Sequence, residues 1–325
     1  MSAPSSGARP AAEVGQILDR AGVPSALWGW WVVSLIAIHY GFPEIEFVVA
    51  DDKLATAVSV LVAAGYEHCT RRQCVEFHAE GSAMQDSTFQ CPTTGKTYMS
   101  MPDIYTRTGL NRYHLIADEH FHFDRRWHFT VLRLYKQSRM LWWLPKDAIK
   151  VGPVADEYFM LSNDENLPPS RANGGIGTGC WRDLPPVKIL RPAKFYEALT
   201  LLRCFYSYVP DWSEHSFKQM NMRLYDTPDH QTYREIQAGI RPEFRSIWMR
   251  ENGESDPSKK VEHSKTGPVK RGPGIYTLLR LRRRLLAGQL DQSANLPPLP
   301  PLDMSRGVKL PEDDVDPDLP APRQV

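Results

Sequence analysis

Cysteine is scarce in this chain, with five among 325 residues. That number is too small for a disulfide scaffold, and an odd count leaves at least one thiol unpaired. The first twelve residues contain one arginine and no apolar run, so they do not resemble a secretory signal. The sequence therefore predicts a reducing compartment, the cytoplasm or, as the alternative, the nucleus.

Long hydrophobic runs and a large net charge are also lacking. The longest apolar run, residues 27–38, ends at His39, whereas a membrane-spanning helix needs about 20 residues, so we expect no transmembrane segment. A net charge of +1 argues against nucleic-acid binding by the chain as a whole. With 42% hydrophobic and 24% charged residues, the composition is typical of a globular protein with one large core or two modest ones.

Proline, in contrast, is abundant, with 27 residues clustered late in the chain, where the charges also separate. Residues 259–284 hold nine basic residues and one acid, whereas residues 291–325 hold seven acids, three bases and eight prolines. An amphipathic helix over 278–290 would present arginines to RNA, an anionic membrane surface, an acidic partner or the protein's own acidic tail. The run 296–302 is typical of polyproline II and fits the groove of an SH3-type domain.

The N-terminal part of the chain alternates helices and strands. We predict helices over 13–21, 30–40 and 53–64, an extended piece at 25–28, and strands at 44–50 and 66–69. Asp51 or Asp52 would cap the third of these helices. Further along, we predict strands at 120–124, 129–135 and 187–190, and helices at 193–209 and from 211 towards 225. This order favours an α+β fold in which helices flank a mixed sheet.

The patterning also divides the chain into six parts. They are a disordered N-terminal tail (1–12), a sheet-containing core (13–160), a flexible loop (161–186), a helical continuation of the same domain (187–258), a basic segment with the amphipathic helix (259–290) and a disordered, proline-rich acidic tail (291–325). The loop contains a glycine-rich run, 173–179, that lacks the preceding strand and following lysine of a phosphate-binding loop.

Residues 25–65 carry the most chemical information. Glu44 and Glu46 lie two apart on a predicted strand, so their carboxylates share a face and can hold a divalent cation between them. Gly29 and Trp30 stand at a turn before a predicted helix, where backbone N–H groups and the helix dipole favour a phosphate. A phosphate at a helix start and a metal on a neighbouring strand are parts of a nucleotidyl-transfer site.

With these residues the sequence resembles the nucleotidyltransferase-fold, or polymerase-beta-like, superfamily. In that superfamily a Gly-Gly or Gly-Ser turn precedes a helix, and a strand with Asp-x-Asp follows, often after a phrase like Tyr-Gly-x-Pro. This chain has Gly29-Trp30 at the turn, HYGFP at residues 39–43, and Glu44-Ile45-Glu46 in place of Asp-x-Asp. Residues 26–65 are similar to a group of uncharacterised fungal proteins with this fold, and the resemblance extends over about residues 14–225.

The resemblance implies a nucleotidyltransferase-like mixed sheet and a role for each matching residue. Glu44 and Glu46 would hold Mg²⁺, and the turn at Gly29 and Trp30 would bind a nucleoside triphosphate. His39 would act as the base that frees the hydroxyl of an acceptor. The acceptor is a small molecule, a protein or RNA, and the sequence does not choose among them.

Three departures from the pattern predict a degenerate site. Trp30 stands where a small residue would let the backbone approach a phosphate. Glutamates replace both aspartates, which displaces the metal by about 1 Å, and such a displacement can cost about 100-fold in rate. Arg133 stands on a later strand, where a third acid is usual. We therefore predict a nucleotidyltransferase-like protein of lost or altered activity. The alternative is a non-catalytic binding or scaffold protein, such as an accessory protein of fungal specialised metabolism.

Two further sets of residues are typical of metal ligands. The first set has two histidines and two carboxylates of the same parity on one strand: His120, His122, Asp118 and Asp124. It fits a second alternative function, a His-based metal enzyme. The second set has a C-x₄-C spacing with two more distant residues, and would bind zinc: Cys69, Cys74, His78 and Cys91.

Overall fold

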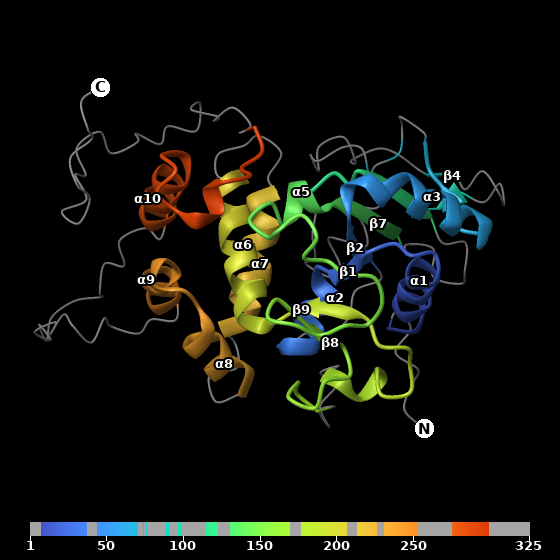
Figure 1. The fold of residues 1–325 in the computed structure, drawn as a ribbon, viewed down its shortest axis with the longest axis horizontal. Coiled ribbons are helices and arrows are strands. Elements are labelled where there is room, and N and C mark those ends of the chain that lie inside the picture. Colours follow the sequence, from blue (N-terminus) through green and yellow to red (C-terminus); the bar gives the residue numbers. More distant parts are fainter. Residues whose placement is uncertain are drawn as a thin grey trace, which may run out of the picture.

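The computed structural model describes residues 8–37, 44–70, 74, 76, 89–90, 97–98, 115–122, 131–169, 177–206, 213–225, 231–251 and 275–298. Within these residues the predicted α+β class is confirmed, because a mixed sheet packs with several helices. The strands of the main sheet lie in one half of the molecule, and helices α6 to α10 lie in the other (Figure 1). None of the helices described is long and apolar enough to cross a membrane.

The main sheet has five strands in the order β1-β2-β7-β6-β3. They are β1 (Ser25–Trp28), β2 (Ile45–Val49), β3 (Glu67–His68), β6 (Glu119–His122) and β7 (Val131–Lys136). The central pair, β2 and β7, is parallel, whereas the pairs β1–β2, β6–β7 and β3–β6 are antiparallel. A parallel pair needs a long crossover, and the chain that joins β2 to β7 contains β3 and β6 itself.

The two faces of the main sheet differ in polarity. All five residues of β2 are buried, and alternate side chains point to opposite faces. Helix α1 (Ala8–Arg20) covers the face that carries Phe47, and it approaches closely because Gly15 has no side chain. A Cβ on Gly15 would lie 2.6 Å from Val187 Cγ1 and 3.7 Å from the Phe47 ring. The opposite face therefore carries Glu46.

Helix α1 starts at Ala8, before the predicted start at Glu13. Ala8, Ala11 and Ala12 are fully buried, and this tertiary packing extends the helix into the segment predicted to be a disordered tail. Helix α2 (Trp30–Ile36) is shorter than predicted, because Ala37 is already extended with φ −132°.

The predicted aspartate cap on the next helix is wrong. A 3₁₀ turn, η1 (Asp51–Lys53), leads into α3 (Leu54–Ala63), and neither has a side-chain cap. The Asp51 carboxylate instead accepts a hydrogen bond of 2.9 Å from the Ser138 backbone N–H, at the start of α5 (Gln137–Met140). Asp51 thus ties the end of β2 to the end of β7, a non-local contact that the local sequence does not reveal.

The remaining strands form two small antiparallel sheets. They are β4 (Phe89–Gln90) with β5 (Thr97–Tyr98), and β8 (Phe159–Leu161) with β9 (Lys188–Leu190). The strand β9 was predicted, and it also contacts β1. A 3₁₀ turn, η4 (Gly177–Cys180), lies within the segment predicted to be a flexible loop.

The helical half is arranged around α6 (Pro192–Tyr206), which contacts α7, α8 and α10. The other helices are α7 (Ser213–Tyr225), α8 (Gln231–Gly239), α9 (Pro242–Glu251) and α10 (Ile275–Leu286). Pro192 begins α6 as predicted, since proline lacks an N–H that the first helical turn would leave unpaired anyway.

The amphipathic helix predicted over 278–290 is present as α10, although it spans Ile275–Leu286. Leu278, Leu281 and Leu285 are buried, as their spacing predicts. Arg282, however, is only 7% exposed, and burial lowers its pKa, so it does not belong to an exposed basic face. The next segment, η5 (Asp291–Ser293), packs on the core through its Gln292 carbonyl, which accepts a 3.1 Å hydrogen bond from Trp142 Nε1. The rest of the predicted acidic tail, from residue 299 on, lies outside the described residues.

A buried lysine on β9 links stability to pH. Burial lowers the pKa of Lys188 from 10.5 to about 8, although Asp19 and Asp156 lie near, and its ammonium donates to the Lys150 carbonyl. Because the unfolded chain holds this proton more tightly, the group's contribution to stability rises with pH between about 8 and 10.5. We expect the unfolding free energy of wild type relative to Lys188→Met to rise by about 1–2 kcal/mol between about pH 7 and pH 10, in urea titrations. A flat or falling difference would contradict this linkage.

Candidate functional site

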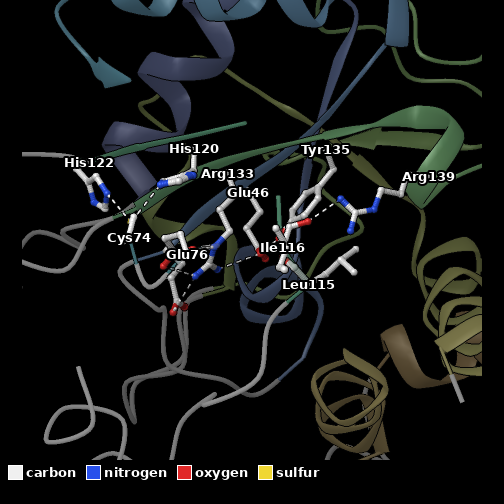
Figure 2. Close-up of polar contacts among 11 residues, drawn as sticks. Glu46, Cys74, Glu76, Leu115, Ile116, His120, His122, Arg133, Tyr135 and Arg139 are labelled. Atoms are coloured by element: carbon white, nitrogen blue, oxygen red, sulfur yellow. Dashed lines mark hydrogen bonds and ion pairs between the residues drawn. The ribbon is translucent and has the colours of Figure 1, made fainter. Parts of the chain in front are cut away.

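A row of polar side chains crosses the main sheet on the face opposite α1. The strand registers place Glu46 of β2 beside Arg133 of β7, and Arg133 beside His120 of β6. Cys69 extends the row, since its backbone N–H donates to the His120 carbonyl over 3.0 Å. Figure 2 shows the histidines and Cys74 at one end, Arg133 with its acids in the middle, and Tyr135 towards the other end. The row contains two adjacent clusters.

The first cluster, called here the arginine cluster, places one guanidinium among three carboxylates: Arg133 with Glu44, Glu46 and Glu76. Glu76 binds it in a bidentate manner, accepting from Nε over 2.6 Å and from Nη2 over 3.1 Å. Nη1 lies 3.3 Å from Glu46 Oε1, and Nη2 lies 3.9 Å from Glu44 Oε1. The guanidinium therefore occupies the space between the two carboxylates that were predicted to hold a cation.

The arginine cluster is buried, which makes each charge depend on its partners. The exposed fractions are 2% for Arg133, 5% for Glu44, 7% for Glu46 and 1% for Glu76. Burial alone would lower the pKa of Arg133, but the neighbouring Glu76, Tyr135 and Glu44 raise it well above its usual value. Arg133 is therefore a permanent cation, and removal of a charge from such a cluster leaves buried charge without compensation.

Tyr135 borders the arginine cluster and contacts Glu46. Its hydroxyl lies 3.1 Å from Glu46 Oε1 and 3.0 Å from the Leu115 carbonyl. Burial, the Glu46 carboxylate and Glu76 raise the pKa of Tyr135 well above its usual value, so the phenol keeps its proton and remains a donor. Glu46 thus accepts from both Arg133 and Tyr135, which fixes its orientation.

The predicted phosphate turn is filled by protein atoms. Gly29 has φ 72° and precedes α2, and a Cβ at this position would overlap Glu46 Oε2. The Glu46 carboxylate thus lies directly against the turn, where it would repel a phosphate. Trp30 and Trp31, in the first turn of α2, are both buried.

The second cluster, called here the Cys/His cluster, combines halves of two predicted ligand sets: Cys69, Cys74, His120 and His122. All four ligand atoms lie within 4.8 Å of one another. His120 Nε2 and His122 Nε2 each lie 3.3 Å from Cys74 Sγ. A hydrogen bond with Cys69, together with burial, raises the pKa of the Cys74 thiol. Of the described residues, these are the ones whose geometry suits a metal ion.

Other predicted ligands do not join these clusters or lie outside the described residues. The Asp118 carboxylate accepts from the Lys136 backbone N–H over 2.9 Å and pairs with Arg139 at 3.6 Å, away from the histidines. The predicted residues outside the described part of the chain are His39, His78, Cys91 and Asp124.

Sequence reasoning missed Glu76 and Tyr135, and it did not join the two ligand sets. An arginine inside the apolar strand VLRLY was a usable signal, because a buried arginine requires a carboxylate partner.

Comparisons with family models, with curated proteins and with solved structures gave no match to this chain.

Removal of the buried guanidinium should destabilise the fold strongly. We expect Arg133→Met to cost about 3–5 kcal/mol in unfolding free energy, because it leaves buried carboxylates without their cation. Arg133→Lys should lose less, since it keeps the charge but not the bidentate geometry. The matched control is Arg245→Met on the exposed side of α9, expected within about 0.5 kcal/mol of wild type. Equal effects of Arg133→Met and Arg245→Met in urea titrations would refute the role given to Arg133.

Gly29 should be intolerant of any side chain. We expect Gly29→Ala to cost about 2–4 kcal/mol, the sum of a positive-φ penalty and the displacement of the Glu46 carboxylate. Gly65→Ala is the matched control, because Gly65 has φ 90° but no atom within 4 Å of an added Cβ. It should cost only about 1–2 kcal/mol. If thermal unfolding shows no difference between the two variants, the Glu46 carboxylate does not pack against Gly29.

Proposed function

We propose that this chain is a nucleotidyltransferase-like protein that has lost nucleotidyl transfer. The observation that carries the proposal is the position of Arg133, with Nη1 3.3 Å from Glu46 and Nη2 3.9 Å from Glu44. A buried, permanent cation there pairs with the carboxylates that an active member of the superfamily would offer to Mg²⁺.

The arrangement of elements supports the nucleotidyltransferase-like part of the proposal. A glycine turn precedes α2, the acid-bearing β2 follows, and β7 lies parallel beside it. Arg133 is directly opposite Glu46 on β7. This is the neighbouring-strand position at which the resemblance leads us to expect a third acid.

The residues at this place do not fit a divalent cation. A cation bound between Glu44 and Glu46 would share its site with the Arg133 guanidinium, and two positive charges within 4 Å repel strongly in a buried site. Glu76, the third carboxylate of the arginine cluster, is engaged through both oxygens with Arg133. The Glu46 carboxylate against Gly29 also disfavours the triphosphate.

Nucleotide binding tests the proposal. In calorimetric titrations of ATP, GTP, CTP and UTP with Mg²⁺ or Mn²⁺ into the full chain, we expect no metal-dependent binding. We also expect no nucleotidyl transfer to the protein itself or to RNA.

The contrary result would be metal-dependent nucleotide binding that Glu46→Gln abolishes and Glu243→Gln preserves. Glu243 lies on α9, away from the arginine cluster, so it controls for loss of a carboxylate as such. That result would mean that Arg133 leaves the space between Glu44 and Glu46 when substrate binds, and that the site is catalytic.

A further inference from the structure

The Cys/His cluster has the composition of a closed zinc site. Two thiols and two imidazoles form one of the common ligand sets of structural zinc, and soft sulfur with nitrogen ligands at four positions selects Zn²⁺ over Mg²⁺ or Ca²⁺. Three of the four residues are buried and His122 is half-buried. Because all four positions belong to the protein, no position remains for a substrate, which argues for a structural site and against a His-based metal enzyme.

The distances between the ligand atoms are close to those of a tetrahedral zinc site. Tetrahedral zinc with Zn–S of about 2.3 Å and Zn–N of about 2.05 Å separates sulfur from nitrogen by about 3.5 Å. Cys74 Sγ lies 3.3 Å from both His120 Nε2 and His122 Nε2. All four ligand atoms lie within 4.8 Å of one another, so shifts of about 1 Å would bring them to tetrahedral zinc geometry.

The pairing of the strands positions three of the four ligands without the help of a metal ion. His120 and His122 alternate on β6 and share a face. Cys69 follows β3 and is fixed opposite His120 by its backbone hydrogen bond of 3.0 Å. The sheet register thus brings a cysteine to two histidines that are 51 and 53 positions away in sequence.

Cys74, the fourth residue of the Cys/His cluster, differs from the other three because it lies neither on a strand of the main sheet nor directly after one. It stands two residues before Glu76, whose carboxylate holds Arg133. The same short stretch of chain therefore contributes one ligand to the Cys/His cluster and one acid to the arginine cluster. A metal on Cys74 would hold this stretch in place, and Glu76 with it.

We propose that the Cys/His cluster binds one structural Zn²⁺, which anchors the chain at Cys74 and so positions Glu76 against Arg133. Zn²⁺ replaces the two thiol protons, so two thiolates and a divalent cation leave the cluster neutral beside the buried arginine cluster. This inference does not depend on whether the arginine cluster binds nucleotides.

The first test is the metal content of the full chain, purified under reducing conditions without a histidine tag. Elemental analysis for Zn, Fe, Cu and Ni should find about one Zn per chain. Reconstitution with Co²⁺ should give the visible absorption bands of tetrahedral cobalt together with thiolate-to-metal charge transfer. No metal before or after reconstitution, or stoichiometric iron or copper in place of zinc, would overturn the proposal. A Cys69–Cys74 disulfide in freshly prepared protein would overturn it too.

Matched variants assign the ligands. Cys74→Ser and His122→Gln should lose zinc, whereas Cys204→Ser and His68→Gln should keep it. Cys204 is a buried cysteine on α6, and His68 lies beside Cys69 but pairs with Glu119 at 2.7 Å. If the ligand variants fail to fold, zinc can be released from wild type to a chromogenic chelator. Free thiols are counted before and after the release, and two additional reactive thiols would show that two cysteines bind the metal. Equal zinc content in all four variants would remove the Cys/His cluster from consideration.

The anchoring role has its own readout. Chelation of the zinc should lower Tm, since metal binding adds to folding free energy. Glu76→Gln should lower Tm markedly in the zinc-loaded protein and much less in the zinc-free protein, because Glu76 then no longer holds Arg133. Equal shifts with and without zinc would show that the metal site and the arginine cluster are independent.

Discussion

A buried guanidinium surrounded by three carboxylates is the interaction on which the rest of the site depends. The main sheet brings Arg133 and Glu46 side by side across its parallel central pair of strands. A buried charge without a partner is strongly destabilising, so Arg133 and Glu46 must stay paired. The neighbouring residues are constrained to shapes and contacts that allow this pairing. Gly29 has no side chain where the Glu46 carboxylate lies, and Tyr135 donates to the same carboxylate.

The same register explains why two chemically different clusters lie next to each other. Glu46, Arg133 and His120 lie side by side on three adjacent strands, and Cys69, directly after β3, lies beside His120. In the arginine cluster, one guanidinium offsets part of the charge of three carboxylates. In our proposal the other cluster uses a metal ion for the same purpose. Each arrangement places a cation among side chains whose burial as anions would otherwise be costly.

Much of the fold could be predicted from the sequence because its signals are local. Period-two alternation marked β2, β6 and β7, and Pro192 marked the start of α6. The α+β class follows from that order. The site was predicted only in its parts: Glu44 and Glu46 were found as a pair, and the cysteines and histidines were assigned to different sites. The pairing of β3 with β6 is non-local, and so is the contact between Glu76 and Arg133. Neither contact leaves a periodic signal in the sequence.

The central claim is that an internal cation stands where a catalytic metal would bind. Anomalous diffraction from crystals soaked with Mn²⁺ and a nucleoside triphosphate tests it most directly, with data also collected at the zinc edge. The account predicts no manganese peak between Glu44 and Glu46, with the Arg133 guanidinium in that space, and a zinc peak within the Cys/His cluster. A manganese peak between the two glutamates, with Arg133 displaced and nucleotide at the Gly29 turn, would contradict it.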